Sequence, residues 1–396
     1  MPKILIGTNE VLKKTKVLFL IESLSGGGAE KVLVTLLQHL DRSRFDVTLC
    51  CVSNTGKYLN EIPDFVHYRY LLPSAVGLSA RSAFWYKIKY KLVYGLLPLR
   101  WVYRLSIPKG NDMEVAFTEG FATKLLAASS NRRAGKAAWL HTDLKNNPWT
   151  QKNRIYRDVY EEGRCYGHYD RIVCVSGTVA QAFKDVYGEP APVSVLYNPV
   201  DSEEIRNLAM KECAVSWLSP KDTIRLVSLG RFVPQKGYDR LIRICGRLRR
   251  EGYGFELVIL GEGDARGLLE TMISQEGLAD CVRLPGFRPN PYPTVASADL
   301  FVCSSRSEGY STAVTEALIL GVPVVTTACS GMLELIGDSG CGLITENDDE
   351  SLLTGLKSLL DNRALLADMK NKAAMRGQAF SLDSTMKPIE DLLLTC

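Results

Sequence analysis

The chain has 396 residues, of which 46% are hydrophobic and 23% are charged, a balance that excludes a disordered or fibrous protein. Its length exceeds what one hydrophobic core usually supports, so we expect two domains. The net charge is only +4, but residues 1–200 carry 27 lysines and arginines against 17 acidic residues, whereas residues 201–396 carry 21 against 27. The N-terminal half is therefore expected to face an anionic partner.

The beginning of the chain and its cysteines predict a cytoplasmic protein. The apolar stretch from Ile4 to Gly7 is too short for a secretory signal, and no window reaches the ~20 apolar residues of a spanning helix. The 11 cysteines lie mostly inside apolar runs, and none pairs with histidines at zinc spacing. We expect buried thiols in a reducing compartment and no structural metal.

The first predicted elements are a strand at 17–21, a glycine loop at 25–30 and a helix with apolar residues from Val32 to Leu40. Similar strand-like runs recur at 47–52, 114–118, 137–141 and 171–175, with helical stretches between them. Alternating strands and helices predict a parallel sheet covered on both faces. Residues 1–198 are thus predicted to form one Rossmann-like domain.

A second series of strands is predicted at 224–230, 256–260, 282–284, 299–303 and 322–326. The same architecture is therefore expected again, in a second Rossmann-like domain over 199–380. Between the two series, Asn198 and Pro199 disfavour a helix and mark a turn, where we place a hinge. Residues 381–396 are predicted to end in a short amphipathic helix that can pack on either domain, including back on the first.

Three motifs follow predicted strands in this order. They are Gly26-Gly27-Gly28-Ala29-Glu30, the loop from Gly230 to Gly237 (GRFVPQKG), and the segment from Glu308 to Glu316 (EGYSTAVTE), in which seven residues separate two glutamates. Together they resemble the retaining, GT-B-fold glycosyltransferases of family 4 (glycosyl transferases group 1), over nearly the whole chain from Lys16. The resemblance implies an α/β GT-B fold, in which two Rossmann-like doubly wound domains face a central cleft.

Arg231 and Lys236 are the predicted catalytic cations. A nucleotide sugar places growing charge on its diphosphate as the glycosidic bond breaks, so a transferase needs cations at the departing oxygens. Both residues follow Gly230 at the carboxyl edge of a predicted strand, where ligands bind in open α/β sheets. Isolated loop charges are more often simply solvated, but their place in the motif favours the functional interpretation.

The segment from Glu308 is predicted to bind the donor. It follows an apolar strand and opens a helix, so the backbone amides of Gly309, Tyr310, Ser311 and Thr312 would point at phosphate. By resemblance, Glu308 contacts the donor sugar and is catalytic, whereas Glu316 holds the ribose hydroxyls. The alternative for Glu316 is a carboxylate on a helix surface, but its mostly apolar neighbours favour a buried group that needs a partner.

Other donor contacts are predicted at both sides of the cleft. Gly27 and Gly28 let the backbone approach a ligand closely, and the resemblance implies that they face the diphosphate, although a glycine triplet is often only a flexible turn. His141 follows a strand and by resemblance lies beside the donor sugar, with a satisfied loop histidine as the alternative. The resemblance also implies that Leu284 and Phe287 border the nucleotide base.

The chemistry is predicted to need no cofactor and no metal, because basic residues and helix amides take the place of a D-x-D carboxylate pattern, which the sequence lacks. No aspartate or glutamate of the first domain stands out as a nucleophile. The resemblance implies retention by same-face attack, with the leaving phosphate accepting the proton. The expected donor is a nucleotide diphosphate sugar, with UDP preferred, that carries a hexose or N-acetylhexosamine.

The acceptor side is predicted from residues 69–109. Between Asp64 and Asp112 the chain has eight basic and no acidic residues, interleaved with aromatic ones. This composition is typical of a segment on an anionic membrane surface, although a solvated face over buried aromatic residues is equally consistent. Nucleic acid is not expected, since no recognition module accompanies the patch. We expect a peripheral enzyme at the inner face of the membrane, with a lipid-linked oligosaccharide acceptor in surface polysaccharide biosynthesis.

Two rival functions stay open from the sequence. The first is a sugar phosphorylase or nucleotide-sugar epimerase, since one fold hosts several reactions. The second is a non-catalytic subunit that binds a nucleotide sugar. Both are less favoured, because Arg231, Lys236, Glu308 and Glu316 are all present.

Overall fold

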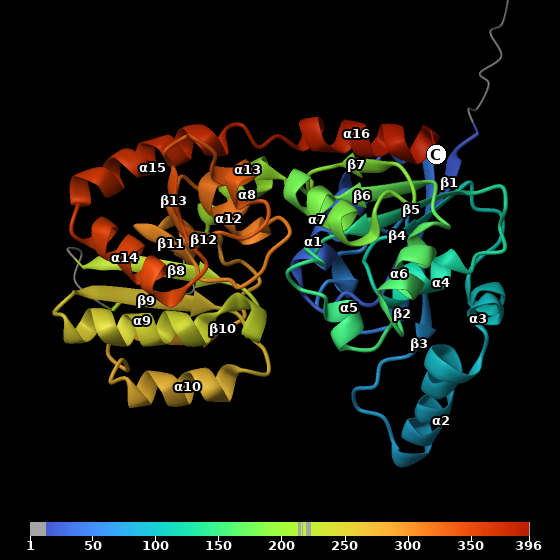
Figure 1. The fold of residues 1–396 in the computed structure, drawn as a ribbon, viewed down its shortest axis with the longest axis horizontal. Coiled ribbons are helices and arrows are strands. Elements are labelled where there is room, and N and C mark those ends of the chain that lie inside the picture. The colour runs from blue at the N-terminus through green and yellow to red at the C-terminus, as the bar shows by residue number, and fades with distance from the viewer. Residues whose placement is uncertain (1–12, 213–214, 216, 219–222, 396) are drawn as a thin grey trace, which may run out of the picture.

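The computed structural model describes residues 13–212, 215, 217–218 and 223–395. Within them the chain forms two separate parallel sheets, each flanked by helices (Figure 1). The first sheet has the strand order β3-β2-β1-β4-β5-β6-β7 and the second the order β10-β9-β8-β11-β12-β13. In each sheet the order reverses beside the first strand of its domain. The prediction of two doubly wound Rossmann-like domains is confirmed.

The first sheet lies between helices on both faces. Its strands are β1 (Thr15–Ile21), β2 (Phe45–Ser53), β3 (His67–Leu72), β4 (Met113–Ala116), β5 (Gly135–Leu140), β6 (Arg171–Cys174) and β7 (Val193–Val195). Its helices are α1 (Gly28–His39), α2 (Ala80–Lys91), α3 (Leu99–Ser106), α4 (Phe121–Ala127), α5 (Trp149–Lys152), α6 (Val159–Tyr166) and α7 (Gly177–Tyr187). A 3-10 turn spans Leu59–Glu61, and a π-helical turn spans Leu92–Leu96.

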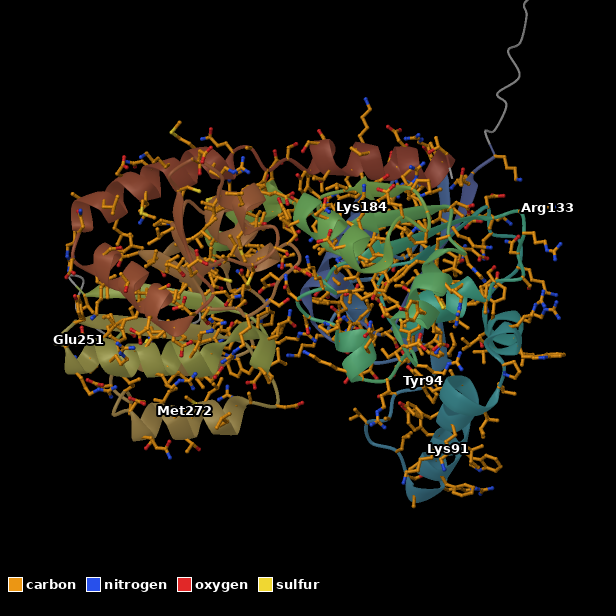
Figure 2. All side chains as sticks on the ribbon, in the orientation of Figure 1. Lys91, Tyr94, Arg133, Lys184, Glu251 and Met272 are labelled. Atoms are coloured by element: carbon orange, nitrogen blue, oxygen red, sulfur yellow. The ribbon has the colours of Figure 1, made fainter. Side chains whose placement is uncertain are left out.

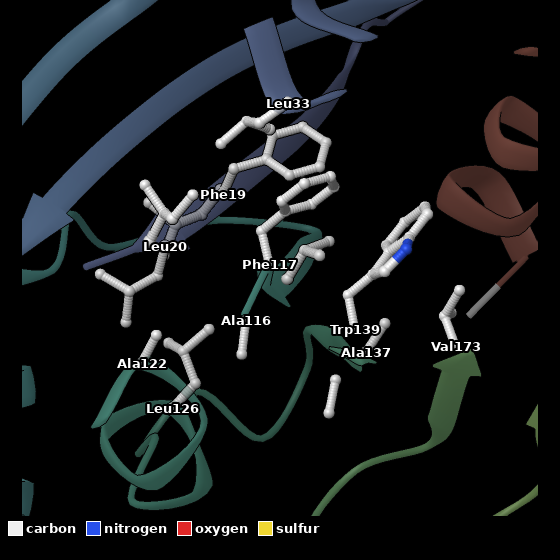
Figure 3. Packing of buried hydrophobic residues seen from close by; sticks show 14 of the residues in the cluster. Phe19, Leu20, Leu33, Ala116, Phe117, Ala122, Leu126, Ala137, Trp139 and Val173 are labelled. Atoms are coloured by element: carbon white, nitrogen blue, oxygen red, sulfur yellow. The ribbon is translucent and has the colours of Figure 1, made fainter. Parts of the chain in front are cut away.

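The core of this domain explains why its central strands are continuous apolar runs. Residues Val17 to Ile21 are all buried, because β1 is covered on both faces. Figure 3 shows aromatic side chains from neighbouring strands packed in a row, with ring centroids 6.0 Å apart for Phe19 and Phe117 and 5.0 Å apart for Phe117 and Trp139. This row lies beneath the loops that carry the first glycine motif and His141.

The second sheet repeats the design. Its strands are β8 (Ile224–Leu229), β9 (Phe255–Leu260), β10 (Val282–Gly286), β11 (Leu300–Cys303), β12 (Val324–Thr327) and β13 (Gly342–Thr345). Its helices are α8 (Ser202–Ala209), α9 (Tyr238–Arg250), α10 (Arg266–Gln275), α11 (Tyr292–Ala296), α12 (Thr312–Ile319), α13 (Met332–Ile336), α14 (Asp349–Leu360) and α15 (Arg363–Gly377), with a 3-10 turn at Pro234–Lys236.

The last helix, α16 (Leu382–Thr395), returns to the first domain (Figure 1). Its buried residues Met386, Ile389, Leu392 and Leu393 join the hydrophobic core of that domain. The carboxylate of Glu390 accepts hydrogen bonds from the backbone of Asp41 at 3.0 Å and from Arg44 at 2.7 Å. The chain therefore crosses between the domains twice, near 198 and near 380. Both crossings line one cavity of about 190 Å³, with Tyr197, Asn198, Phe380 and Ser381 among its walls.

Helix α2 projects from the first domain, at the lower right of Figure 1. None of its residues is buried, and its side chains stand clear of the body around the labelled Lys91 (Figure 2). Residues 69–72 of the basic and aromatic segment belong instead to β3, which pairs with β2 at the edge of the sheet. In the part of the chain that the structure describes, no helix has the length and apolar character needed to cross a bilayer.

Candidate active site

The predicted motifs meet where the two domains face each other. The first glycine motif follows β1, and the motif from Glu308 follows β11, so each lies at a carboxyl edge where its sheet order reverses. A Cβ added to Gly28 would lie 3.3 Å from Oγ1 of Thr312 in the other domain. Gly27 is the N-cap residue of α1. The structure thus brings Gly27 and Gly28 opposite the beginning of α12.

Lys236 and Glu308 form an ion pair inside the second domain, with Nζ and Oε1 2.6 Å apart. Oε1 of Glu308 also accepts a hydrogen bond from Ser305 at 2.5 Å, and the described residues give Oε2 no partner. Burial opposes the charged form of Lys236, but the charge of Glu308, the nearby Cys303 and the hydrogen bond to Glu308 together outweigh it, so the pKa of Lys236 is raised. The lysine is therefore a permanent cation at this position.

Arg231 is exposed at the beginning of the same loop and makes no ion pair or hydrogen bond within the described residues. The nearby carboxylate of Glu30, on α1 of the first domain, interacts with it electrostatically. Gly230 precedes it, and a Cβ there would lie 2.8 Å from the hydroxyl of Tyr238. A larger residue at 230 would therefore displace the side chain of Tyr238 or that of Lys236. The guanidinium itself is free to bind an anion in the cleft.

Glu316 lies on α12 and is only 4% exposed. Its Oε1 accepts a hydrogen bond from Nζ of Lys31 at 2.5 Å, and the hydroxyl of Tyr292 lies 3.5 Å away. Nζ of Lys31 also donates to the hydroxyl of Tyr292 at 2.5 Å. Burial is the largest single influence and lowers the pKa of Lys31, but the charge of Glu316, together with Tyr292 and the hydrogen bonds to both groups, more than reverses it, so the pKa is raised. A buried carboxylate on α12 thus has a partner from the opposite domain.

The loop before α12 approaches the first domain closely. A Cβ on Gly309 would lie 2.0 Å from the carbonyl oxygen of His141, so only glycine fits without moving the domains apart. Ser311 caps α12 by accepting from the amide of Val314 at 3.4 Å. The ring of Tyr310 packs on Tyr197 near the crossing, 5.3 Å between centroids. Tyr310 can therefore contribute to the cleft through its backbone rather than its ring.

His141 lies at the end of β5 with its ring against Phe117, 5.0 Å between centroids. Burial lowers the pKa of His141 to about 4, although a hydrogen bond to the backbone of Phe117 opposes that effect. The imidazole is thus neutral near pH 7. Its Nε2 is buried and has no partner within the described residues. A ring held in this way can offer Nε2 to a hydroxyl group as an acceptor.

Phe287 and Leu284 differ in their exposure to the cleft. Nζ of Lys57, in the first domain, lies 3.7 Å from the centroid of the Phe287 ring, a cation–π contact across the cleft. Leu284 lies in β10 and packs on the core of the second domain, and its carbonyl accepts from Arg266 at 3.1 Å. Phe287 therefore borders the cleft, whereas Leu284 is mainly part of the wall behind it.

Several residues of the cleft were not predicted. Glu30 ends the quoted glycine motif and Lys31 directly follows it, so the motif pointed to their position, whereas Lys57 and Tyr292 carry no comparable signal. Glu119 is 2% exposed and accepts from the backbone of His141 at 3.1 Å and from Nε1 of Trp149 at 3.3 Å. With both oxygens engaged, Glu119 positions the histidine loop.

Two further contacts join the domains beside this site. Oγ of Ser330 donates to Asp143 at 2.6 Å. The carboxylate of Glu334 accepts from the backbone amides of Gly177 and Thr178, at the beginning of α7, at 3.0 and 3.1 Å. An anion at a helix N-terminus is a favourable arrangement. The two domains are therefore in direct contact beside the site.

No three histidine, cysteine, aspartate or glutamate side chains of the described residues form a group that could hold a metal ion. Metal-independent chemistry stays a prediction.

Comparisons with known proteins agree with this geometry. Residues 211–376 match the family described as Glycosyl transferases group 1, and residues 26–204 match Glycosyltransferase Family 4. The chain is 30% identical over 374 residues to N-acetylgalactosamine-N,N'-diacetylbacillosaminyl-diphospho-undecaprenol 4-alpha-N-acetylgalactosaminyltransferase of Campylobacter jejuni, covering 91% of this chain and 94% of that protein. It is 28% identical over 209 residues to the lipopolysaccharide core biosynthesis glycosyltransferase LpsE of Rhizobium meliloti, covering 52% and 58%.

Solved structures share the arrangement of two domains. Anabaena HepE in complex with UDP and glucose superposes with a TM-score of 0.73 at 20% identity, over 96% of this chain and 100% of that one. Sucrose-phosphate synthase from Thermosynechococcus elongatus gives a TM-score of 0.75 at 14% identity, over 96% and 98%. At these identities the likeness shows the fold alone.

Proposed function

Because this chain belongs to the glycosyl transferases group 1 family, it is a glycosyltransferase, and we propose that it is a retaining enzyme that uses a UDP-sugar. The observation that carries the proposal is the meeting of Arg231, the Lys236–Glu308 pair and the beginning of α12 in one cleft. Two cations and a helix N-terminus complement a diphosphate. The donor sugar is a hexose or N-acetylhexosamine, and the name of the Campylobacter relative makes N-acetylgalactosamine the first to test.

The proposed reaction exchanges one glycosidic bond for another. The bond from C1 of the sugar to the β-phosphate breaks, and C1 bonds to an acceptor hydroxyl on the same face. The proton of that hydroxyl passes to the departing phosphate, and UDP leaves. Arg231 and Lys236 stabilise the charge that grows on the phosphates, in a site that excludes much of the water. No metal is needed in this scheme.

The carboxylates of the first domain support same-face attack. A double displacement needs a free carboxylate near C1, but both oxygens of Glu119 are engaged. The carboxylate of Glu30 turns back to the backbone of Gly27 and of its own residue, in the manner of a capping box. Neither group is poised as a nucleophile. Oε2 of Glu308 and Nε2 of His141 are the groups left to hold sugar hydroxyls.

The proposed acceptor is a sugar hydroxyl of a lipid-linked oligosaccharide in surface polysaccharide biosynthesis. The Campylobacter relative is named for a diphospho-undecaprenol acceptor, and LpsE is named for lipopolysaccharide core biosynthesis. Such acceptors keep their lipid in the membrane, so the enzyme must work at its surface. We place it at the cytoplasmic face, where nucleotide sugars are made.

The projecting α2 region is the proposed contact with the membrane. Large apolar side chains are exposed there, including Phe84 at 59%, Trp85 at 61% and Leu96 at 71%. Basic residues surround them, and no acidic residue lies between Asp64 and Asp112. Exposed rings among cations suit the headgroup region of an anionic bilayer. The region is far from the second domain, so donor binding leaves it accessible (Figure 1).

A thermal-shift panel tests the donor class. UDP, GDP, ADP and their sugar conjugates are added to the full chain, and a ligand that binds the folded state raises its melting temperature. We expect a selective response to UDP and its sugars. Transfer from UDP-N-acetylgalactosamine to a polyprenyl-diphosphate oligosaccharide is then followed with and without a chelator. An α-linked product formed in the presence of the chelator is expected, and a β-linked product would contradict retention.

Co-sedimentation with vesicles tests the membrane contact. The double variant Phe84→Ala, Trp85→Ala should partition onto phosphatidylglycerol vesicles at least about fivefold less than the wild type, because it lacks the two exposed rings that would enter the headgroup region. Tyr160→Ala is the matched control, since Tyr160 is an aromatic residue of α6 that is 76% exposed. Equal partition of both variants and the wild type would contradict this contact.

A further inference from the structure

The carboxylate of Glu316 is held by a lysine that belongs to the opposite domain. Lys31 lies in the first turn of α1, directly after the glycine motif, and its Nζ is 2.5 Å from Oε1 of Glu316. The side chain of Lys31 is 33% exposed, whereas that of Glu316 is 5% exposed. Helices α1 and α12 face each other across the boundary between the domains (Figure 1).

The hydroxyl of Tyr292 completes a closed set of contacts. It accepts from Lys31 at 2.5 Å and lies 3.5 Å from Oε1 of Glu316, so the lysine and the tyrosine both address the same carboxylate oxygen. A carboxylate oxygen has about two lone-pair sites. The oxygen is therefore satisfied by protein groups alone, although it lies where a nucleotide is expected to bind.

This arrangement conflicts with the role that the family resemblance implies for Glu316, which is to hold the ribose hydroxyls of the donor. Ribose hydroxyls that donate to Glu316 must replace one or both of the present donors. The other contacts between the domains do not have this conflict, since Ser330 bonds Asp143 and Glu334 bonds the beginning of α7. Lys236 also differs, because its partner Glu308 lies in its own domain. Among these contacts, only that between Lys31 and Glu316 is an ion pair that joins the two domains through a residue expected to bind the donor.

We propose that Lys31 occupies the ribose carboxylate before a donor binds, and that the ribose hydroxyls of the donor displace it. The inference rests on the proposed function, since it takes Glu316 as the ribose ligand. A vicinal diol offers two hydrogen-bond donors to the carboxylate and can satisfy it without the ammonium group. Lys31 is then released into the cleft with its charge uncompensated. Lys31 thus competes with the ribose hydroxyls alone, so it weakens the binding of a nucleotide that carries them and leaves a nucleotide without them unaffected.

Nucleotide titration of Lys31→Met tests the competition. Methionine keeps most of the apolar stem and removes the charge. The probes are UDP and 2′,3′-dideoxyuridine diphosphate, which lacks both hydroxyls. We expect UDP to bind about fivefold tighter to the variant, because its ribose no longer competes with a partly buried ion pair. The affinity for the dideoxy nucleotide should change less than about twofold. Lys145→Met is the matched control, since Lys145 pairs with Asp185 on the surface of the same domain.

Two outcomes of the titration would overturn the inference. Weaker binding of UDP to Lys31→Met would make Lys31 a direct ligand of the nucleotide. Equal tightening of both nucleotides would show that the lysine closes the cleft without competing with ribose.

Hydrogen exchange without nucleotide separates this inference from the proposed function. In Lys31→Met and in Glu316→Gln, amide exchange should rise over Gly28–His39 and Thr312–Ile319 relative to the wild type, because the contact between α1 and α12 is lost. Unchanged exchange in both variants would overturn the occupation of Glu316 by Lys31. A wild-type chain that binds no nucleotide would instead remove the proposed function, and the exchange result would still decide whether Lys31 occupies Glu316.

Discussion

Arg231 and Lys236 carry the same charge in different surroundings. Arg231 is exposed and has no partner in the described chain, whereas Lys236 is paired with Glu308 at 2.6 Å. The free guanidinium can follow the phosphates as charge develops on them. The paired ammonium both supplies charge and holds Glu308 in place.

We expect Arg231→Ala and Lys236→Ala each to lose about 2 to 4 kcal/mol of transition-state stabilisation, the scale of oriented charge stabilisers. The quantity to measure is kcat/KM for transfer to a fixed acceptor. Lys145→Ala serves as the control, because that lysine lies on the outer surface. Near-wild-type values for both site variants would remove these residues from catalysis.

The partly buried ring of His141 makes the free energy of unfolding depend on pH. Its pKa is lowered to about 4 by burial, so the unfolded chain binds the proton first as the pH falls. Stability from the neutral ring is therefore complete above the unfolded value near 6.5 and is lost as the pH falls from there toward 4. Between pH 7 and pH 5 we expect the wild type to lose roughly 1 to 2 kcal/mol more unfolding free energy than His141→Asn. Urea unfolding at both pH values measures this, and equal losses would contradict the burial of the ring.

At the level of elements, the closest approach between the domains is backbone against backbone. Gly309 precedes α12, and a Cβ there would meet the carbonyl of His141 at 2.0 Å. Gly309→Ala should therefore hold the loop before α12 away from β5 and lower kcat/KM at least about 100-fold, since misplacement by about 1 Å has effects of that size. Gly267→Ala is the control, because a Cβ on that helical glycine meets nothing within 4 Å. Activity of Gly309→Ala equal to that of the control would mean that the cleft does not need this approach.

The elements that escaped prediction have few buried apolar residues. β7 has only three residues and none is buried, and β13 begins with Gly342. β3 lies at the edge, and four of its six residues are at least partly exposed, so its charged and aromatic side chains resembled a surface segment. Strands buried on both faces, such as β1 and β9, were found because every position in their centre is apolar. A strand that is buried on both faces has a continuous apolar sequence that can be recognised, whereas a strand that pairs at the edge of a sheet has no such pattern.

The sequence predicted the parts of the site that lie in one continuous segment. It did not predict contacts between segments that are distant in the sequence. The residues from Glu308 to Glu316 share one loop and helix, so their order along the chain predicts where they lie in the structure. Lys31 and Glu316 are 285 residues apart, and no property of either predicts their contact. The same holds for Lys57 and Phe287, which meet only because both domains close on the cleft.

For the whole molecule, α16 is the element that ties the second domain to the first. Ile389 is fully buried in the core of the first domain, whereas Leu394 on the same helix is 41% exposed. Ile389→Ala should therefore lower the unfolding free energy by about 2 to 4 kcal/mol, and Leu394→Ala by less than about 0.5 kcal/mol. Denaturant unfolding of both variants gives the comparison. Similar values would mean that α16 does not pack on the first domain.

The two crossings of the chain near 198 and near 380 also restrict how the domains can move. The two crossings are covalent links that lie side by side in the walls of one cavity. Such a pair of links allows one domain to rotate relative to the other about the line that joins the links. It resists rotation about other axes. Relative motion then has essentially one degree of freedom. A single distance between the domains, such as one from α5 to α10, would follow the entire path from open to closed, and every other distance would be a function of it.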